Sequence, residues 1–392
     1  MRIAVVVGTR PESIKLAPVV HTLGPEAFTI HTGQHHTAGM TGHIHPDFTL
    51  SPHRDAPRGQ QLGSMTAELD RVFRRYRPAA VIVQGDTTSA LAGGLAANAT
   101  DTPLVHVEAG LRSFDRTMPE EHNRILLDHL SDLACAPTPQ AHTNLRAENI
   151  PPDRITITGN TIVEAIQNAL PGARRGEILR AELGLPTGPF TLATLHRPEN
   201  TDNPTALAII LSELSAIDIP VVIPLHPRTQ RRIIHSGLDT PRPNLRMTGP
   251  LEYPDLLALI HQSALVISDS GGIQEESAVL KSPILIIRRS NERPEVEDTF
   301  GTRLHQDGPI SSTANTWIYH RTHINARLAE LPSPYGDGTA STQIAQATKA
   351  LLMSYGKSQD SRTRVTPARN PASVAAAQHD QRRNPRADQP LP

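Results

Sequence analysis

The sequence predicts an α/β protein with two doubly wound parallel sheets. Short, nearly continuous apolar runs alternate with stretches of helix length along most of the 392 residues. Strands of this kind are typical of parallel sheets that helices cover on both faces. The length is also sufficient for two domains, each with its own core.

The predicted strands are the short apolar runs, and the helices are the stretches between them. The runs lie at residues 2–7, 28–32, 80–84, 103–107, 133–136, 155–158, 190–195, 220–224, 245–248, 264–267 and 283–287. Prolines and glycines around one charged helix, at about 168–188, separate two groups of runs. We therefore predict an N-terminal domain at 1–170, a C-terminal domain at 171–340, a terminal helix at 341–355 that could pack back on the N-terminal domain, and a disordered tail at 356–392.

Composition limits the partners and the location of the chain. The formal net charge is −1, so no global field favours nucleic acid or an anionic membrane surface. No apolar run approaches the roughly 20 residues that span a bilayer, and the N-terminal run at 2–7 is too short for a signal peptide. The single Cys135 lies in an apolar run and cannot form an internal disulfide. We therefore expect a buried thiol and a cytoplasmic protein.

Polar and reactive residues follow one predicted strand after another, directly beyond the carboxyl end. Open α/β sheets bind their ligands at that end. The segments are Gly8-Thr9-Arg10, Gly85-Asp86-Thr87, His106-Val107-Glu108, His196-Arg197, His226 and Asp269-Ser270. With two domains, we expect the site in a central cleft where both sets of strand ends face each other.

The most informative of these segments runs from Asp269 to Glu276 and reads as a strand end, a small-residue loop and a helix. The first turn of a helix carries unpaired N–H groups and the positive end of the helix dipole, so it attracts phosphate. Ser270, Gly271 and Gly272 let a bulky anion approach the backbone. Glu275 and Glu276 add carboxylates that could hold sugar hydroxyls, which favours a sugar nucleotide over a plain phosphate. The simpler interpretation is a strand–helix turn with solvated glutamates.

A second helix start, at Gly8 to Glu12, also suits an anion. Gly8 permits a tight turn, and Pro11 suits an early helical position because its missing N–H would be unpaired there anyway. Arg10 and Lys15 could both reach the anion, although Lys15 could equally be a solvated surface lysine. The segment lacks Gly-x-Gly-x-x-Gly, so NAD is not indicated, and we predict no cofactor.

Carboxylates that could perform acid–base chemistry lie in the first half of the chain. Asp86 and Glu108 follow neighbouring strands, and Glu120 opens a helix on which it shares a face with Arg124. Beside Arg124 and His196, these carboxylates could divide acid and base roles, because like charges and burial push their pKa values apart. The competing interpretation is an ordinary surface pair of Glu120 with Arg124 and a structural histidine.

A metal site is the other competing idea. Histidines gather at His31, His35, His36, His43 and His45. No HExxH or Cys/His pattern accompanies them, so we predict no metal.

Taken together, the motifs resemble the non-hydrolysing UDP-N-acetylglucosamine 2-epimerase family. They occur in register over about residues 1–352, although no single motif is decisive. The matching segments are Gly8-Thr9-Arg10-Pro11-Glu12, Lys15-Leu16-Ala17-Pro18, Thr32-Gly33-Gln34-His35, Gly85-Asp86-Thr87, His106 to Arg112, Pro119 to Arg124, Thr158-Gly159-Asn160-Thr161, His196 to Asn200, Asp269 to Glu276, Glu292 to Glu295 and Pro334 to Gly338. The resemblance implies two Rossmann-like domains arranged as in GT-B glycosyltransferases, with neither metal nor NAD, and a homodimer.

The resemblance also implies a reaction and a set of roles. UDP would leave UDP-N-acetylglucosamine to give a 2-acetamidoglucal, and would then return with a proton delivered to the other face of C2. The implied catalytic residues are Asp86, Glu108, Glu120, Arg124 and His196. The implied substrate-binding residues are Arg10, Lys15, Gln34, His35, His226, Ser270, Gly271, Gly272, Glu276 and Arg293.

Several functions remain open at this point. A hydrolysing relative would release N-acetylmannosamine and UDP, a GT-B glycosyltransferase would need an acceptor, and a non-catalytic relative would only bind the UDP-sugar. The sequence does not choose between UDP-N-acetylglucosamine and a modified sugar such as a diacetamido uronic acid derivative. The segment after Gln34-His35 departs from the family pattern, which leaves activation by a second UDP-N-acetylglucosamine in doubt.

Overall fold

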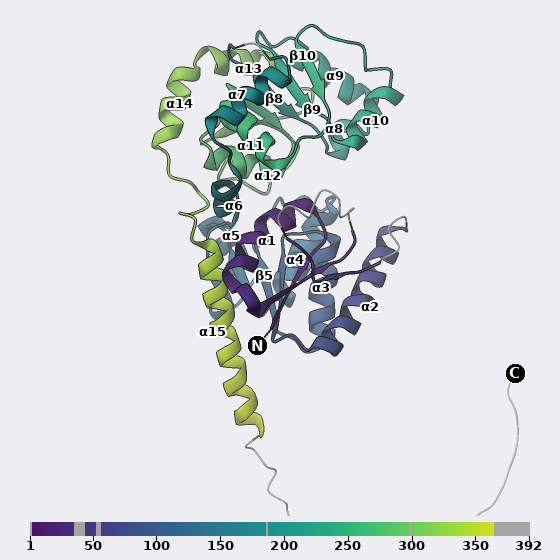
Figure 1. The fold of residues 1–392 in the computed structure, drawn as a ribbon, viewed down its shortest axis with the longest axis vertical. Helices are drawn as coiled ribbons and strands as arrows, with labels where there is room; N and C mark the ends of the chain where they lie inside the picture. Colours follow the sequence, from purple (N-terminus) through teal and green to yellow (C-terminus); the bar gives the residue numbers. More distant parts are fainter. Residues whose placement is uncertain (1, 35–43, 52–55, 186, 298, 364–392) are drawn as a thin grey trace, which may run out of the picture. The chain divides into compact units, whose positions relative to one another are not determined.

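The computed structural model describes residues 2–34, 44–51, 56–185, 187–297 and 299–363, and it contains two parallel sheets of seven and six strands (Figure 1). The predicted fold class, two doubly wound parallel sheets with helices between the strands, is confirmed. Contacts group Met1–Leu352 into one compact unit, which contains both sheets.

The first sheet has the strand order β3-β2-β1-β4-β5-β6-β7. Its strands are β1 (Ile3–Val7), β2 (Ala27–His31), β3 (Phe48–Thr49), β4 (Ala80–Gln84), β5 (Leu104–Val107), β6 (Leu133–Ala136) and β7 (Ile155–Ile157). The order reverses between β1 and β4, and such a switch point leaves a crevice at the carboxyl ends of the two strands. The loops after β1 and β4 therefore meet at one place.

The second sheet repeats this arrangement, with the order β10-β9-β8-β11-β12-β13. Its strands are β8 (Thr191–Thr194), β9 (Val221–Pro224), β10 (Leu245–Thr248), β11 (Leu265–Ser268), β12 (Ile284–Ile287) and β13 (Gly301–Leu304). Here the switch point lies between β8 and β11, so the loops after these two strands lie together.

Helices cover both faces of each sheet. They are α1 (Arg10–Leu23), α2 (Arg58–Tyr76), α3 (Thr88–Ala99), α4 (Pro119–Leu130), α5 (Pro139–Ala147), α6 (Ile162–Ala169), α7 (Ala173–Glu182), α8 (Pro198–Thr201), α9 (Pro204–Ser215), α10 (Pro227–His235), α11 (Tyr253–Gln262), α12 (Gly271–Val279), α13 (Ile310–Tyr319), α14 (Arg321–Glu330) and α15 (Ala340–Thr363). None of the helices that the structure describes combines the length and apolar character that a membrane span requires.

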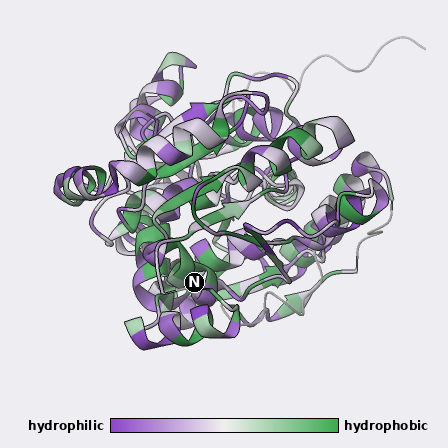
Figure 2. Cartoon of the chain, turned by 90° about the horizontal axis from the view of Figure 1, so that it is seen from above, coloured by the Kyte–Doolittle hydropathy of each residue, from purple (hydrophilic) through white to green (hydrophobic). Residues whose placement is uncertain are grey.

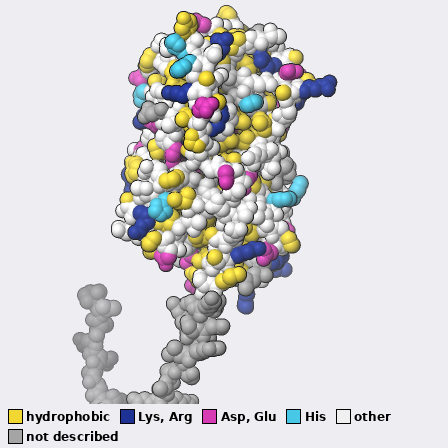
Figure 3. Space-filling view, turned by 90° about the vertical axis from the view of Figure 1, so that its left-hand side faces the viewer, with side chains coloured by type: hydrophobic (Ala, Val, Ile, Leu, Met, Phe, Trp, Pro, Cys, Tyr) yellow, Lys and Arg dark blue, Asp and Glu magenta, His cyan; other side chains and the backbone are white. Residues whose placement is uncertain are grey.

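Alternating side chains of the central strands supply two cores per sheet. In β1, Val6 packs with the apolar residues of α2 and α3, whereas Val5 and Val7 pack with those of α1. The strands are accordingly the most hydrophobic segments in Figure 2. Charged side chains are scattered over the described part of the face in Figure 3.

Two helices, α6 and α15, pack against the sheet that does not contain the strand before them in sequence. Ile162 and Ile166 of α6 belong to the core of the second sheet, together with Leu192 and Val266. Ile344 of α15 instead belongs to the core on the α1 face of the first sheet. The chain thus leaves the first sheet, builds the second, and returns to cover the first.

The structure differs from the predicted elements at the sheet edges and at the chain end. The strands β3 and β13 are absent from the prediction, because each is short, half-exposed and not apolar throughout. The terminal helix runs to Thr363, beyond the predicted end at 355. The rest of the predicted tail, 364–392, lies outside the described residues.

Candidate active site

The two switch points supply most of the candidate site. The loop after β4 carries Asp86, and the loop after β8 carries His196, each directly beyond its strand. Glu108 follows β5 and has a φ of 66°, a left-handed conformation that is unfavourable for a residue with a side chain. Such local strain is typical of functional sites, where the surrounding structure holds it in place.

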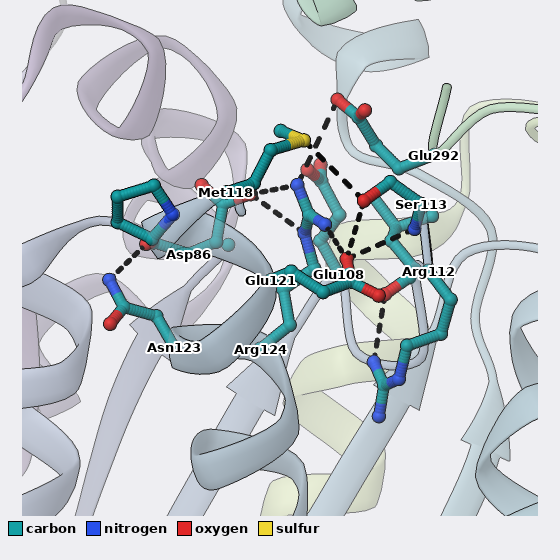
Figure 4. Close-up of polar contacts among 12 residues, drawn as sticks. Asp86, Glu108, Arg112, Ser113, Met118, Glu121, Asn123, Arg124 and Glu292 are labelled. Atoms are coloured by element: carbon teal, nitrogen blue, oxygen red, sulfur yellow. Dashed lines mark hydrogen bonds and ion pairs between the residues drawn. The ribbon is translucent and has the colours of Figure 1, made fainter. Parts of the chain in front are cut away.

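Asp86 is held by the helix α4. The Arg124 side chain approaches Asp86 Oδ2 through Nε and NH2, both at 2.8 Å, and Asn123 Nδ2 donates to the Asp86 carbonyl oxygen at 2.7 Å (Figure 4). Arg124 is 2% exposed, whereas the Asp86 side chain is 29% exposed. The carboxylate therefore has a fixed cation behind it and remains accessible.

The partner of Arg124 on its own helix is Glu121 and not Glu120. Glu121 is buried, forms an ion pair with Arg124, and accepts from the backbone N–H groups of Ser113 at 3.0 Å and Phe114 at 2.9 Å. Glu120 is exposed. The competing interpretation, a surface pair of Glu120 with Arg124, is therefore wrong, because Arg124 is buried and pairs with Glu121 and Asp86. The Glu120 side chain therefore stays accessible, as that of Asp86 does.

A closed ring of four buried charges joins the two halves of the chain. Lys15 Nζ lies 2.5 Å from Glu108 Oε2 and 2.6 Å from Glu275 Oε2. Arg293 contacts the same two carboxylates, with Nε 2.7 Å from Glu275 and NH2 3.4 Å from Glu108. All four side chains are at most 7% exposed. The predicted alternative of a solvated Lys15 is wrong.

The two carboxylates of the ring raise the pKa of Lys15, and one of them also accepts a hydrogen bond from Asn160. Burial alone would lower the pKa of Lys15, but the charges of Glu108 and Glu275 outweigh it, so the pKa is raised. Asn160 Nδ2 donates to Glu108 Oε2 at 3.2 Å. The Glu108 carboxylate thus has three donors around it in the free protein.

His196 is oriented by a buried aspartate. Its Nδ1 lies 2.9 Å from Asp269 Oδ1, and the same carboxylate accepts from the backbone N–H groups of His196 and Arg197. Burial would raise the pKa of Asp269, but His196 and hydrogen bonds from Asn200 and Arg197 lower it to about 2. The Asp269 carboxylate therefore fixes the ring by its Nδ1 edge and leaves Nε2 for a ligand.

The segment predicted to bind an anion, called the anion cradle below, is the N-terminus of α12. Ser270 is the N-cap, and Gly271 and Gly272 are the first helical residues. A Cβ on Gly271 would lie 2.3 Å from Arg293 NH1, so only glycine lets this guanidinium approach the helix end. Glu276 is 7% exposed, and its pKa is raised to about 7 by burial and by the charge of Glu275. The segment thus combines backbone N–H groups, a guanidinium and a carboxyl group that titrates near neutral pH.

A continuous series of contacts leads from Asp86 to His196. Arg124 lies 3.9 Å from Glu292 Oε1, and Arg197 lies 3.6 Å from the same oxygen. Arg197 is next to His196 in sequence and also donates from Nε to the Asp269 carbonyl at 2.9 Å. The carboxylates of the first half and the anion cradle of the second half are therefore brought together.

The other predicted binding residues have the following contacts, and the positive charge of Arg10 also acts on the Glu276 carboxyl group. Arg10 donates to the Leu251 carbonyl at 3.3 Å, and Gln34 accepts from the Ser89 hydroxyl at 2.6 Å. His226 is exposed and caps α10. His35 lies outside the described residues, as do His36 and His43 of the histidine group.

Metal and thiol chemistry have little support among the described residues. Within the described part of the chain, no group of three or more His, Cys, Asp or Glu side chains is placed to hold a metal ion. Cys135 is buried, as predicted, and burial raises the pKa of its thiol to about 12. A thiol with this pKa is a poor nucleophile at neutral pH.

Fold and site together define an α/β enzyme with an anion cradle facing a set of carboxylates. The protein-family model described as UDP-N-acetylglucosamine 2-epimerase matches residues 23–349. The chain belongs to this family, as the motifs predict.

Individual relatives agree with this assignment. The chain is 36% identical over 358 residues to the UDP-N-acetylglucosamine 2-epimerase of Methanococcus maripaludis, covering 86% of this chain and 96% of the relative. It is also 36% identical to the UDP-2,3-diacetamido-2,3-dideoxy-D-glucuronate 2-epimerase of Pseudomonas aeruginosa, over 88% of this chain and 99% of the relative. The crystal structure of Methanocaldococcus jannaschii UDP-GlcNAc 2-epimerase with UDP-GlcNAc and UDP has a TM-score of 0.78 at 34% identity, over 91% of this chain and 100% of that chain. These similarities indicate an epimerase of sugar nucleotides with a GT-B-like fold.

Sequence reasoning missed residues whose importance depends on long-range contacts. Glu121, Asn160, Asp269, Glu275 and Glu292 all contact predicted site residues. The sequence indicates none of these contacts: Glu275 is expected to hold sugar hydroxyls, and Asp269 to lie at a strand end of the site. Asp269 and Glu275 lie within the Gly-rich motif, and Glu292 precedes Arg293, so proximity to a motif was an available signal. Nothing in the sequence showed which of the neighbouring glutamates face the interior.

Proposed function

We propose that the chain catalyses the reversible C2 epimerisation of UDP-N-acetylglucosamine to UDP-N-acetylmannosamine without net hydrolysis. The hydrogen at C2 is not activated by a carbonyl group, so simple deprotonation would be slow. Elimination avoids this difficulty: the C1–O bond breaks with departure of UDP, a base takes the C2 proton, and a C1=C2 double bond forms. UDP then adds back at C1 while a proton is delivered to the opposite face of C2.

The residues divide into three groups in this proposal. Asp86, Glu108 and Glu120 are the candidates for the acid and base roles, and their assignment to the two faces of the sugar stays open. Glu120 is exposed at the start of α4 and is therefore accessible to a substrate. Asp86 contacts the buried guanidinium of Arg124 and its carboxylate is accessible, which makes it a candidate base.

The second and third groups act on UDP. His196 would donate to the departing diphosphate through Nε2, since Asp269 holds the opposite edge of the ring. The developing negative charge would be stabilised by Arg10, Lys15, Arg124 and the Ser270–Gly272 loop, the kind of electrostatic term that is often largest in catalysis. Glu276 would bind the ribose hydroxyls, and Arg293, Gln34, His35 and His226 would complete the binding site.

The observation that carries this proposal is the series of contacts from Asp86 through Arg124, Glu292 and Arg197 to His196. This series supports an arrangement in which Asp86 and the N-terminus of α12 act on one substrate, as an elimination at neighbouring carbons requires. The known epimerase structure with UDP-GlcNAc and UDP supports a UDP-sugar as the substrate. We also infer a cytoplasmic homodimer, and light scattering of the purified protein tests the oligomeric state.

Incubation with UDP-N-acetylglucosamine in D2O tests the reaction. The expected result is formation of UDP-N-acetylmannosamine with deuterium at C2 in both UDP-sugars. Stoichiometric release of free UDP would instead reveal a hydrolysing enzyme. The same assay with UDP-2,3-diacetamido-2,3-dideoxy-D-glucuronate is required, because the two named relatives are equally similar to the chain. Unlabelled, unchanged UDP-sugars in both assays would refute the proposal.

A further inference from the structure

One buried carboxylate, that of Glu292, contacts the guanidinium groups of four arginines. Glu292 lies in the segment after β12 and is 3% exposed. Its partners are Arg288 at 2.5 Å, Arg293 in a direct ion pair, Arg197 at 3.6 Å and Arg124 at 3.9 Å. Figure 4 shows the contact with Arg124. Among the described residues, no other carboxylate contacts as many as four guanidinium groups.

The four arginines come from distant parts of the sequence. Arg124 lies on α4 in the first half, Arg197 follows β8, and Arg288 and Arg293 follow β12. Other carboxylates face two of them, since Asp86 and Glu121 contact Arg124, while Glu275 and Glu108 contact Arg293.

Arg197 and Arg288 depend more strongly on Glu292 for a counter-charge. Among the described residues, Glu292 is the only carboxylate that forms an ion pair with Arg288 or with Arg197. Without it, two guanidinium groups would lie close to two more in a poorly solvated region, and their mutual repulsion would be large. The position of Arg197 matters most, because it is next to His196.

We propose that Glu292 is a positioning residue for the reaction: it is the internal counter-anion that keeps these guanidinium groups assembled before the diphosphate of the substrate arrives. The inference rests on the proposed function in assuming that the incoming anion is a UDP-sugar diphosphate. Once the diphosphate binds, the arginines have a second anion to share. Glu292 therefore competes electrostatically with the ligand that it prepares the site to receive.

This dual effect gives a signature that a purely structural role lacks. Neutralising Glu292 removes a negative charge next to the anion site, so UDP should bind as tightly as before or more tightly. Turnover should nevertheless fall, because the guanidinium groups are no longer held where negative charge develops on the departing diphosphate. Misplacement by about 1 Å can cost about 100-fold in rate.

The experiment compares Glu292→Gln and Glu292→Asp with Glu164→Gln. Glu164 is a matched control, since it is a buried glutamate, 8% exposed, that accepts from the Ser341 N–H at 2.8 Å and contacts none of the four arginines. For each variant, calorimetry measures the affinity for UDP, and scanning fluorimetry measures the thermal midpoint of unfolding. Steady-state kinetics with the UDP-sugar that the wild type converts give kcat and KM.

We expect Glu292→Gln to lower kcat by about 100-fold with an unchanged or lower UDP Kd, and Glu292→Asp to recover at least about tenfold of that loss. Glu164→Gln should keep both values. A kcat of Glu292→Gln within about threefold of wild type would overturn the proposal. A UDP Kd raised about tenfold or more in Glu292→Gln would overturn it as well, because it would indicate a collapsed site.

UDP binding does not depend on turnover, so failure of the proposed function is recognised separately. If the wild type binds UDP but converts no UDP-sugar, the epimerase proposal fails. The positioning role is then decided by a crystal structure of Glu292→Gln. Displaced Arg197 and Arg288 side chains support it, and unchanged ones refute it.

Discussion

The Lys15 ammonium lies 2.6 Å from the Glu275 carboxylate, although the two residues belong to helices that cover different sheets. Lys15 is on α1, beside the first sheet, and Glu275 is on α12, beside the second. Because Glu108 and Arg293 close the ring, each carboxylate has one cation from each half of the chain. The predicted catalytic group Glu108 is thus part of the contact between the halves.

Loss of the Lys15 charge should destabilise the protein. In Lys15→Met, Glu108 and Glu275 remain buried with Arg293 as their only shared cation, and breaking a buried pair in this way costs about 3–5 kcal/mol. Urea denaturation measures the free energy of unfolding. Lys349→Met is the control, because Lys349 is about half exposed and pairs with Glu26 at the surface. Equal losses in the two variants would show that the ring adds no stability.

Gly271 and Gly272 should respond differently to the same substitution. A Cβ at Gly271 would meet Arg293 NH1 at 2.3 Å, whereas at Gly272 it would meet only Ser270 Oγ at 3.9 Å. Gly271→Ala should therefore displace Arg293 and lower the free energy of unfolding by about 1–3 kcal/mol. Gly272→Ala should retain the wild-type stability, since alanine is the better helix former. Chemical denaturation of both variants checks this, and an equally stable Gly271→Ala would contradict it.

The ionisation of Glu276 should control UDP affinity near neutral pH. Burial and the Glu275 charge raise the pKa of Glu276 to about 7, while the proposed acceptor of ribose hydroxyls is the carboxylate. Binding should therefore release a proton and tighten as the pH rises, by about tenfold between pH 6 and pH 8. Calorimetry on the wild type and Glu276→Gln separates this effect from the titration of UDP itself. The same pH dependence in both proteins would exclude Glu276 as its source.

Asp269 should stabilise the folded protein while it is ionised, and acid should remove this stabilisation by protonating it. Its folded pKa of about 2 lies below the ordinary value of 3.8, so the contribution is present above about pH 4 and is lost as the pH falls towards 2. The stability difference between wild type and Asp269→Asn should shrink by about 1 kcal/mol from pH 5 to pH 3.

His196 provides the control for that measurement, because its charge lowers the pKa of Asp269. In a His196→Gln background, the pH dependence of the Asp269→Asn difference should be weaker. A difference that stays constant between pH 5 and pH 3 in the wild-type background would show that the pKa of Asp269 is not lowered.

Sequence reasoning succeeded where a local pattern determines the structure. The apolar runs located the central strands. The polar residues beyond them mark the carboxyl ends at which doubly wound folds bind ligands, but not the strand order that creates the two switch points. Glu120 and Glu121 show what a local sequence pattern cannot predict, namely which of two adjacent side chains is buried. Both open the same helix, and only tertiary packing decides that Glu121 faces Arg124 and Glu120 faces solvent.

Glu292 illustrates a second reason for incomplete prediction. Its partners lie on three separate segments, and no spacing within the sequence announces that they converge. The edge strands β3 and β13 escaped prediction for a related reason, since their pairing depends on a neighbour and not on their own apolar character.

The return of α15 to the first sheet has a consequence for biosynthesis. Ile344 and Ala345 complete a core that begins with Ile3 and Val5, so the first sheet lacks part of its cover until residues 344 and 345 have left the ribosome. A chain that terminates before residue 340 would leave this apolar surface open to water. Early nonsense mutations and C-terminal trimming should therefore yield aggregates in place of a shortened, folded first half.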